Sequence, residues 1–476
     1  MKSMVDGNQS KRIDKPKTTF GELGISQTLL TAVQERGLVE PTEIQAASIP
    51  ALIHDRKSDF ILASHTGSGK TLAYLLPLVH ALKEEEGWTG IPIKPGRPRA
   101  LVLGPTRELA EQIHAVCKSL SHVAKFRTVL ATGSGEMTSQ RAALQKPLDV
   151  LVATPARVVQ HASRGNMYYG DVRFVVLDEA DTMLDRGFGP EVSQILEAVR
   201  LKRREGDPAR CILVSATMSK PVKRLITEQF PNIRTIETST LHRGVQGAKH
   251  IFLPVIGTDN KLDVALQVVG GEVARGHRVM MFCNTLDSCR AAEHRLREEG
   301  LSTVCYHGDM PMEERKEALV KFSGEESPIL VATDLAARGL DIPGRVDHVV
   351  NFDFPLNPID YLHRTGRTAR AGASGKITSL VAKSDKVLAQ RIEDALAKGL
   401  PLDQLSASKA TLPPHMRPKP ETLARRAAER KASLHSRRGR GSSSPASTAK
   451  SRSTSPSRVR GTVNSASKFT KNRKFK

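Results

Sequence analysis

The chain has few aromatic residues and no long apolar segment. Phe, Trp and Tyr make up 4% of its 476 residues, with a single tryptophan, Trp88. No stretch of 18 apolar residues occurs, so the sequence predicts no membrane-spanning helix and no membrane partner. Hydrophobic residues still amount to 39% of the chain, which is enough to fill the cores of two or three ordinary domains.

Cysteine is also scarce, and its spacing excludes the usual zinc motifs. The five cysteines are Cys117, Cys211, Cys283, Cys289 and Cys305, and no two of them form a CxxC pair. Most of them sit in or beside apolar runs. This pattern favours buried thiols in a reducing compartment over a metal site or a disulfide framework.

Acidic residues nearly disappear at the C-terminal end. Residues 409–476 hold 19 Lys or Arg against two Glu, a net charge of +17, which leaves only +5 of the chain's +22 for the rest. The same segment is rich in Ser, Gly and Pro, so we expect a disordered basic tail over residues 402–476. Its high positive charge favours the interpretation that it is an arm that binds nucleic-acid phosphates without sequence preference. A solubilising or targeting role is the other interpretation, and the two are compatible.

Short apolar runs alternate with helical patterns in two series. The first series begins at residues 60, 100, 129, 150, 174 and 212, and the second at residues 251, 279, 303, 329, 348 and 377. This alternation predicts an α/β fold with two parallel sheets covered on both faces. We expect a flexible segment over residues 1–19, a first domain over 20–236, a linker over 237–249 and a second domain over 250–401.

A phosphate-binding loop follows the first apolar run. It consists of Ser64, His65, Thr66, Gly67, Ser68, Gly69, Lys70 and Thr71, and an apolar-periodic helix comes directly after it. Backbone N–H groups at that helix N-terminus can surround phosphates, Lys70 can reach the β and γ oxygens, and Thr71 can contact a metal. Ser64 stands where Gly or Ala is usual, but a small residue should still fit.

Two carboxylates follow the apolar run that begins at Phe174. Asp178 and Glu179 lie at the end of this predicted strand, within the tetrapeptide Asp178 to Asp181. Paired with the phosphate loop, Asp178 is expected to hold Mg²⁺ together with Thr71, and Glu179 to position and deprotonate water. These parts predict a nucleoside triphosphatase.

With these motifs in order, the chain resembles a DEAD-box RNA helicase from Phe20 to about Leu400. The resemblance implies two tandem RecA-like domains, ATP and Mg²⁺ as cofactors, and RNA as partner. Upstream of the phosphate loop, Phe20 and Gln45 resemble the adenine-reading Q motif of the family. Gln45 has an amide that can meet both edges of adenine, and Phe20 can stack on its face.

The resemblance also implies RNA contacts, arginine fingers and residues that couple the two domains. RNA-binding positions are Pro105, Thr106, Arg107, Gly133, Thr154, Pro155, Arg157, Asn284, Arg315, Thr333, Asp334 and Arg338. Arg367 and Arg370 would act as catalytic arginine fingers on the γ-phosphate, and Gly339 and Asp341 would bind the nucleotide. Coupling positions are Asp181, Ser215, Thr217, His363 and Arg364. Ser134 and Ala156 stand where the family often has glycine, a departure that should tune the grip on the strand without removing it. Met312 stands where the family often has glutamine.

Three functions follow from these expectations. The first is a monomeric, RNA-stimulated ATPase that closes on RNA, unwinds short duplexes or remodels RNA–protein complexes, and serves the maturation of ribosomal RNA or pre-ribosomal particles. The second is an ATP-gated RNA clamp or assembly scaffold with little unwinding, and the third is RNA annealing by the tail alone. Two compartments are compatible with the sequence. The Ser64-His65 variant of the phosphate loop resembles plant organellar members of the family, which favours an organelle, and the basic tail equally suits the nucleus or nucleolus.

Overall fold

A computed structural model describes residues 18–405, apart from 90–92, 134, 203–208, 240, 242, 246, 257–259, 325, 335–341, 343, 371–372 and 404. Residues 1–17 of the predicted flexible segment 1–19, and nearly all of the predicted tail, lie outside the described residues. Within the described part, no helix is long and apolar enough to cross a membrane.

The first domain is built on a seven-stranded parallel sheet with the order β3-β4-β2-β5-β6-β1-β7. Its strands are β1 (Phe60–Ala63), β2 (Ala100–Leu103), β3 (Thr128–Ala131), β4 (Val150–Ala153), β5 (Phe174–Leu177), β6 (Arg210–Ser215) and β7 (Arg234–Glu237). Its helices are η1 (Phe20–Leu23), α1 (Gln27–Glu35), α2 (Glu43–His54), α3 (Lys70–Thr89), α4 (Arg107–Ala124), α5 (Met137–Leu144), α6 (Pro155–Ser163), α7 (Ala180–Asp185), α8 (Gly189–Lys202) and α9 (Lys220–Gln229).

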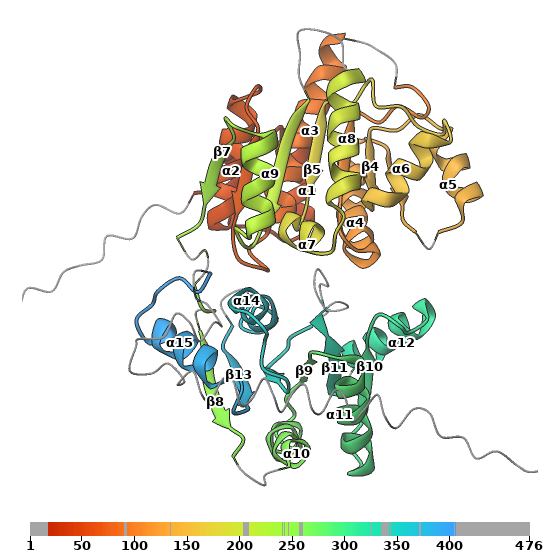
Figure 1. The fold of residues 1–476 in the computed structure, drawn as a ribbon. Helices are drawn as coiled ribbons and strands as arrows, with labels where there is room; N and C mark the ends of the chain where they lie inside the picture. The colour runs from red at the N-terminus through yellow and green to blue at the C-terminus, as the bar shows by residue number, and fades with distance from the viewer. Residues whose placement is uncertain are drawn as a thin grey trace, which may run out of the picture. The chain divides into compact units, whose positions relative to one another are not determined.

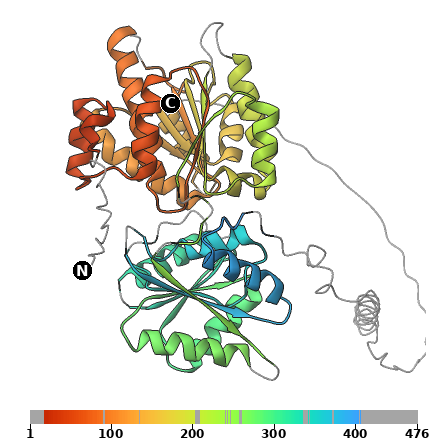
Figure 2. The same ribbon diagram turned by 90° about the vertical axis from the view of Figure 1, so that its left-hand side faces the viewer.

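Helices cover both faces of this sheet. Apolar side chains of α1 to α4 pack on one face, and those of α5 to α9 pack on the other. Figure 1 labels these helices around the sheet, and Figure 2 shows the red and orange helices on one side and the yellow-green helices on the other. Two-sided burial explains why β1, β2, β4 and β5 read as continuous apolar runs in the sequence, because every side chain of these strands is buried.

The second domain holds a six-stranded parallel sheet with the order β10-β11-β9-β12-β13-β8. Its strands are β8 (Ala248–Pro254), β9 (Val279–Cys283), β10 (Thr303–Tyr306), β11 (Ile329–Thr333), β12 (His348–Asn351) and β13 (Gly375–Val381). The described helices are α10 (Lys261–Val273), α11 (Leu286–Glu298), α12 (Met312–Ser323), α14 (Pro358–Thr365) and α15 (Lys386–Ala397). The predicted fold class of two RecA-like parallel-sheet domains is therefore confirmed.

One strand escaped the sequence-based prediction. β7 pairs with β1 at the edge of the first sheet, but its residues Arg234 to Glu237 are mostly exposed and polar. An edge strand buries little apolar surface, so it leaves no continuous apolar run in the sequence. As a result, strands occupy both ends of the predicted linker, since β7 ends at Glu237 and β8 begins at Ala248.

All five cysteines are free and buried, as the sequence predicted.

Candidate active site

The strand order brings three separate sequence motifs to one edge of the first sheet. β1, β6 and β5 are neighbours, and the phosphate loop, Ser215 and Asp178 lie at their carboxyl ends. In an open parallel sheet, ligands bind at this edge. Residues about a hundred positions apart in the chain therefore lie at one edge of the sheet.

The phosphate loop has the backbone shape of an anion-binding loop. Gly67 and Gly69 have φ angles of 79° and 87°, in the left-handed region that glycine tolerates. The ammonium of Lys70 donates to the carbonyl oxygens of Ser64 at 2.6 Å and His65 at 2.7 Å. The buried Ser68 hydroxyl has no hydrogen-bond partner in the described structure. A buried polar group without a partner is costly, so this hydroxyl fits a bound phosphate oxygen.

Gln45 links the predicted adenine-reading motif to the phosphate loop. Its Oε1 accepts from the backbone N–H of Thr42 at 3.0 Å, and its Nε2 donates to the carbonyl of Gly69 at 3.0 Å. Both ends of the amide are thus engaged, and reading adenine would require these bonds to be exchanged. Phe20 is only 3% exposed and belongs to the hydrophobic core, so in this conformation its ring offers little surface to a base.

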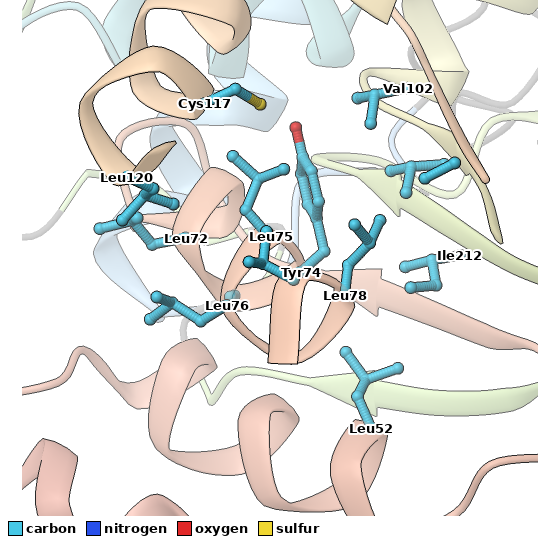
Figure 3. Packing of buried hydrophobic residues seen from close by; sticks show 14 of the residues in the cluster. Leu52, Leu72, Tyr74, Leu75, Leu76, Leu78, Val102, Cys117, Leu120 and Ile212 are labelled. Carbon is cyan, nitrogen blue, oxygen red and sulfur yellow. The ribbon is translucent and has the colours of Figure 1, made fainter. Parts of the chain in front are cut away.

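Asp178 is held from two directions. The hydroxyl of Tyr74 donates to its Oδ2 at 2.8 Å, and the backbone N–H of Glu179 donates to its Oδ1 at 2.9 Å. Tyr74 lies on α3, four residues after Lys70, and Figure 3 shows its ring between Leu75, Leu78, Val102 and Ile212. Each carboxylate oxygen keeps a lone pair for a cation or water. The sequence reasoning did not single out Tyr74, although its position one helical turn after Lys70 was a usable signal.

Glu179 has a strained backbone and a perturbed carboxyl. Its φ and ψ angles are 50° and 51°, and it is one of three non-glycine residues with positive φ in the described part of the chain. Burial raises the pKa of Glu179 to about 7, and the neighbouring charge of Asp181 adds to this effect. Its Oε2 is buried without a hydrogen-bond partner among the described atoms. Backbone strain, an elevated pKa and a carboxylate oxygen without a hydrogen-bond partner are typical of a general base that binds a water molecule during the reaction.

Asp181 connects β6 to the second domain. Its Oδ2 accepts from the backbone N–H and the hydroxyl of Thr217, at 2.9 and 2.7 Å, and lies 3.7 Å from Nε2 of His363. Burial opposes ionisation of Asp181, but His363 and the Thr217 hydrogen bonds outweigh it and lower its pKa. The Ser215 hydroxyl donates to the carbonyl of Thr217 at 2.6 Å and so shapes the same turn. Four of the five predicted coupling residues therefore meet at this point.

A hollow of about 320 Å³ unites the predicted catalytic residues. Its lining includes Lys70, Thr71, Asp178 and Glu179 from the first domain, and Arg367 and Arg370 from the second. A second hollow of about 340 Å³ shares Thr66, Gly67 and Arg370 with it. These side chains can surround a polyphosphate with the two arginines of the second domain on one side and Lys70 and the two carboxylates of the first domain on the other. The other predicted nucleotide contacts, Gly339 and Asp341, lie outside the described residues, as does Arg338.

The predicted RNA contacts of the first domain occupy the other half of the same sheet edge. They follow the neighbouring strands β2, β4 and β3, away from the phosphate loop. Thr106 caps α4 by accepting from the N–H of Leu109 at 3.1 Å, and Pro155 is the first residue of α6. Arg157 donates to the carbonyl oxygens of Gly133 and Gly135. In this conformation Arg157 shapes the Gly133–Gly135 turn, while the N-termini of α4 and α6 remain available for phosphates.

In the second domain, Arg364 organises the predicted RNA contacts. This side chain is 1% exposed and donates to both carboxylate oxygens of Asp334, at 2.6 and 2.5 Å, and to Oδ1 of Asn284. Arg364 therefore acts inside the second domain, by fixing two side chains at the carboxyl ends of β11 and β9. Thr333, the last residue of β11, lies beside them.

Arg315 instead forms an ion pair with Glu108 of α4, at 2.7 Å. The sequence reasoning did not identify Glu108 as a partner, because nothing in the local pattern relates two residues so far apart.

Comparisons with known proteins agree with this geometry. Residues 42–225 match the DEAD/DEAH box helicase family, and residues 260–372 match the helicase conserved C-terminal domain. The chain is 50% identical over 400 residues to DEAD-box ATP-dependent RNA helicase 39 of Arabidopsis thaliana, covering 83% of this chain and 64% of that protein. The matched stretch thus spans less than two thirds of that relative's length.

Two further relatives extend the comparison. The chain is 38% identical over 396 residues to ATP-dependent rRNA helicase RRP3 of Coccidioides immitis, covering 83% of this chain and 79% of that protein. Among solved structures, Dbp5 of S. cerevisiae bound to RNA and ADP BeF3 is similar at a TM-score of 0.69 and 28% identity, covering 79% of this chain and 93% of that one. With the nucleotide motifs assembled at one sheet edge, these matches show that the chain belongs to the DEAD-box ATP-dependent RNA helicases.

Proposed function

We propose that this ATPase hydrolyses ATP when its two domains close on RNA, and that closure unwinds short RNA duplexes or remodels RNA–protein complexes. The observation that carries the proposal is the hollow of about 320 Å³ lined by Lys70, Asp178 and Glu179 together with Arg367 and Arg370. Neither domain holds a complete site alone. Hydrolysis therefore depends on a ligand that favours the closed state, which is the role we assign to RNA.

Each side chain receives a role from its chemistry. Lys70 binds the β and γ oxygens, Glu179 takes the proton of the attacking water, and Arg367 and Arg370 stabilise the charge that develops on the transferred phosphoryl group. Asp178 and Thr71 would hold Mg²⁺, which neutralises phosphate charge when bound. The residues fit this ion because Asp178 presents two fixed oxygens beside the phosphate loop. In the hollow that adjoins the phosphate loop, Gln45 and Phe20 would rearrange to accept adenine.

We assign ribosomal RNA or pre-ribosomal particles as the substrate class. Support comes from the similarity to a protein named ATP-dependent rRNA helicase and from the strongly basic segment 409–476 of this chain. An ATP-gated clamp is the second candidate. The site is complete only when the two domains close, and the closed domains could hold an RNA strand without unwinding a duplex.

The test measures ATP hydrolysis with and without RNA. Lys70→Ala and Glu179→Gln should each lower the RNA-stimulated rate by about a hundredfold or more, because they remove phosphate binding and the general base. Glu197→Gln, which makes the same chemical change at an exposed position of α8, should leave the rate unchanged. Wild-type levels of RNA-stimulated hydrolysis in Lys70→Ala would refute the proposed site.

Duplex unwinding separates the two candidates. A helicase releases a labelled strand from a short RNA duplex in the presence of ATP. A clamp instead stays on RNA with a nonhydrolysable analogue and releases no strand.

A further inference from the structure

A groove runs beside α5, outside the ATP site. It has a volume of about 470 Å³ and is lined by Pro95, Gly96, Met137, Thr138, Arg141, Leu144, Gln145, Arg164, Gly165, Asn166 and Tyr168. These residues come from α5 and the residue after it, from the segment that follows α6 and from the segment before β2. Figure 1 shows α5 and α6 together at the β4 side of the first sheet. We call this hollow the α5 groove.

The charge of the α5 groove is of one sign. Arg141 and Arg164 are both exposed, and the described structure gives neither an ion-pair partner. No carboxylate is among the lining residues. The comparable hollow of about 460 Å³ in the second domain is different, because its basic residues are accompanied by the four acids Glu293, Asp309, Glu314 and Glu317. Of these two hollows, only the α5 groove has the uniformly positive charge that suits a polyanion.

An aromatic ring accompanies the two guanidinium groups. Tyr168 is 51% exposed and is the only aromatic residue among the exposed large hydrophobic residues in the described part of the chain. The guanidinium of Arg97 lies 5.2 Å from the centroid of its ring and also pairs with Asp171 at 3.7 Å. The guanidinium of Arg97 thus helps to orient the ring of Tyr168. An exposed ring beside unpaired arginines is the combination that binds single-stranded nucleic acid, by stacking a base and by pairing with phosphates.

Met137 joins the α5 groove to the predicted RNA contacts. Arg157 donates to the carbonyl oxygens of Gly133 and Gly135 and contacts Sδ of Met137 at 3.6 Å. Met137 is the first residue of α5 and also lines the groove. A strand bound beside Gly133, Gly135 and Arg157 would therefore lie next to Met137, at the end of the groove formed by the N-terminus of α5. At 1.5 Å per residue, the eight residues of α5 extend this path by about 12 Å.

We infer that the α5 groove is an additional RNA-binding site, in which Arg141 and Arg164 bind phosphates and Tyr168 stacks on a base. This inference rests on the proposed function, because it extends the path of the same RNA strand. A competing structural role exists for the arginines, which lie at the C-terminal ends of α5 and α6, where cations stabilise a helix. Removing the two arginine charges would weaken RNA binding if they bind phosphates, but would lower only the melting temperature if they stabilise the helix ends.

The experiment compares two double variants of the full chain. Arg141→Gln with Arg164→Gln should weaken binding to a long single-stranded RNA about tenfold or more. It should also lower the slope of log affinity against log salt by about 1.4, since each bound phosphate contributes about 0.7. Lys57→Gln with Lys223→Gln removes the same charge from exposed positions of the same domain and should change neither quantity. Binding to an RNA too short to reach the groove should be equal in both.

Tyr168 supplies a test that leaves charge and helix ends untouched. Tyr168→Ala should weaken binding to the long RNA about fivefold or more because the base no longer stacks on a ring, and Tyr168→Phe should restore it. The inference is overturned if the arginine double variant binds long RNA with the affinity and salt slope of its control, or if its only defect is a lower melting temperature. Absence of RNA-stimulated ATP hydrolysis in the unmodified chain would instead overturn the proposed function, whatever the binding results.

Discussion

Tyr74 shows how a single residue outside the sequence motifs supports the ATP site. Its hydroxyl is fully buried and donates to Asp178, the carboxylate that we assign to the metal. Burial and the nearby charge of Asp178 raise the pKa of Tyr74 well above its usual value, so the hydroxyl keeps its proton and remains a donor. Groups that hold a metal ligand in place commonly affect metal affinity as much as the rate.

Tyr74→Phe should raise the Mg²⁺ concentration needed for half-maximal ATP hydrolysis by about tenfold, because Asp178 loses one of the two donors that fix it. The rate at saturating Mg²⁺ should change much less. Titration of Mn²⁺ binding to the ADP-loaded protein by electron paramagnetic resonance provides a measurement independent of turnover.

The control for this prediction is Tyr361→Phe. It also removes a buried hydroxyl with a hydrogen-bond partner, since the Tyr361 oxygen lies 2.7 Å from Nδ1 of His250. Equal Mg²⁺ requirements in the two variants would contradict the role of Tyr74.

At the scale of elements, the start of β12 contains a pH-sensitive contact between strands. His348 is fully buried, and its Nε2 lies 2.8 Å from the hydroxyl of Thr378 on β13, while its Nδ1 has no hydrogen-bond partner in the described structure. Burial, assisted by the positive charge of Lys376, lowers the pKa of His348 from 6.5 to about 4. The unfolded chain therefore binds a proton at a higher pH than the folded chain does.

The resulting stability is complete above the unfolded pKa and is lost as the pH falls from about 6.5 towards 4. Between pH 7 and pH 5 the loss should be about 2 kcal/mol, which denaturant unfolding of the second domain can measure. His348→Gln should flatten this dependence. His122→Gln, at an exposed position of α4, should not. A pH dependence that is the same in both variants would show that another group is responsible.

At the scale of the whole molecule, most of the basic charge and the proposed chemistry belong to different parts of the chain. The residues that we propose as catalytic lie in the two sheet domains, whereas residues 409–476 carry +17 of the net charge of +22. A chain that ends at Leu405 should keep RNA-stimulated ATP hydrolysis. Its RNA affinity should fall, and the salt slope should decrease by about 0.7 for each phosphate that the shortened chain no longer binds.

Filter binding or fluorescence anisotropy over a range of salt concentrations would measure this change. An unchanged salt slope after truncation would contradict the assignment of the tail as a phosphate-binding arm. Loss of all RNA-dependent behaviour would instead favour RNA annealing by the tail.

The sequence by itself determined the fold class and the chemistry of the ATP site. Strands buried on both faces leave apolar runs such as Val150–Ala153, and a phosphate loop requires small residues and a lysine at fixed spacing. Both signals are local. The edge strand β7 gave no such signal because its exposed residues do not need to be apolar.

Only the tertiary structure decided which side chains meet. The order of the strands places Asp181 against Thr217 in the first domain, and buried Arg364 against Asp334 and Asn284 in the second. The contact between Asp181 and His363 joins residues of the two domains. It also brings Tyr74 to Asp178 and opens the α5 groove between segments that are distant in the sequence. The physical reason is that hydrogen bonds and ion pairs act over a few ångströms in space, whereas a local sequence pattern records only the environment of each residue along the chain.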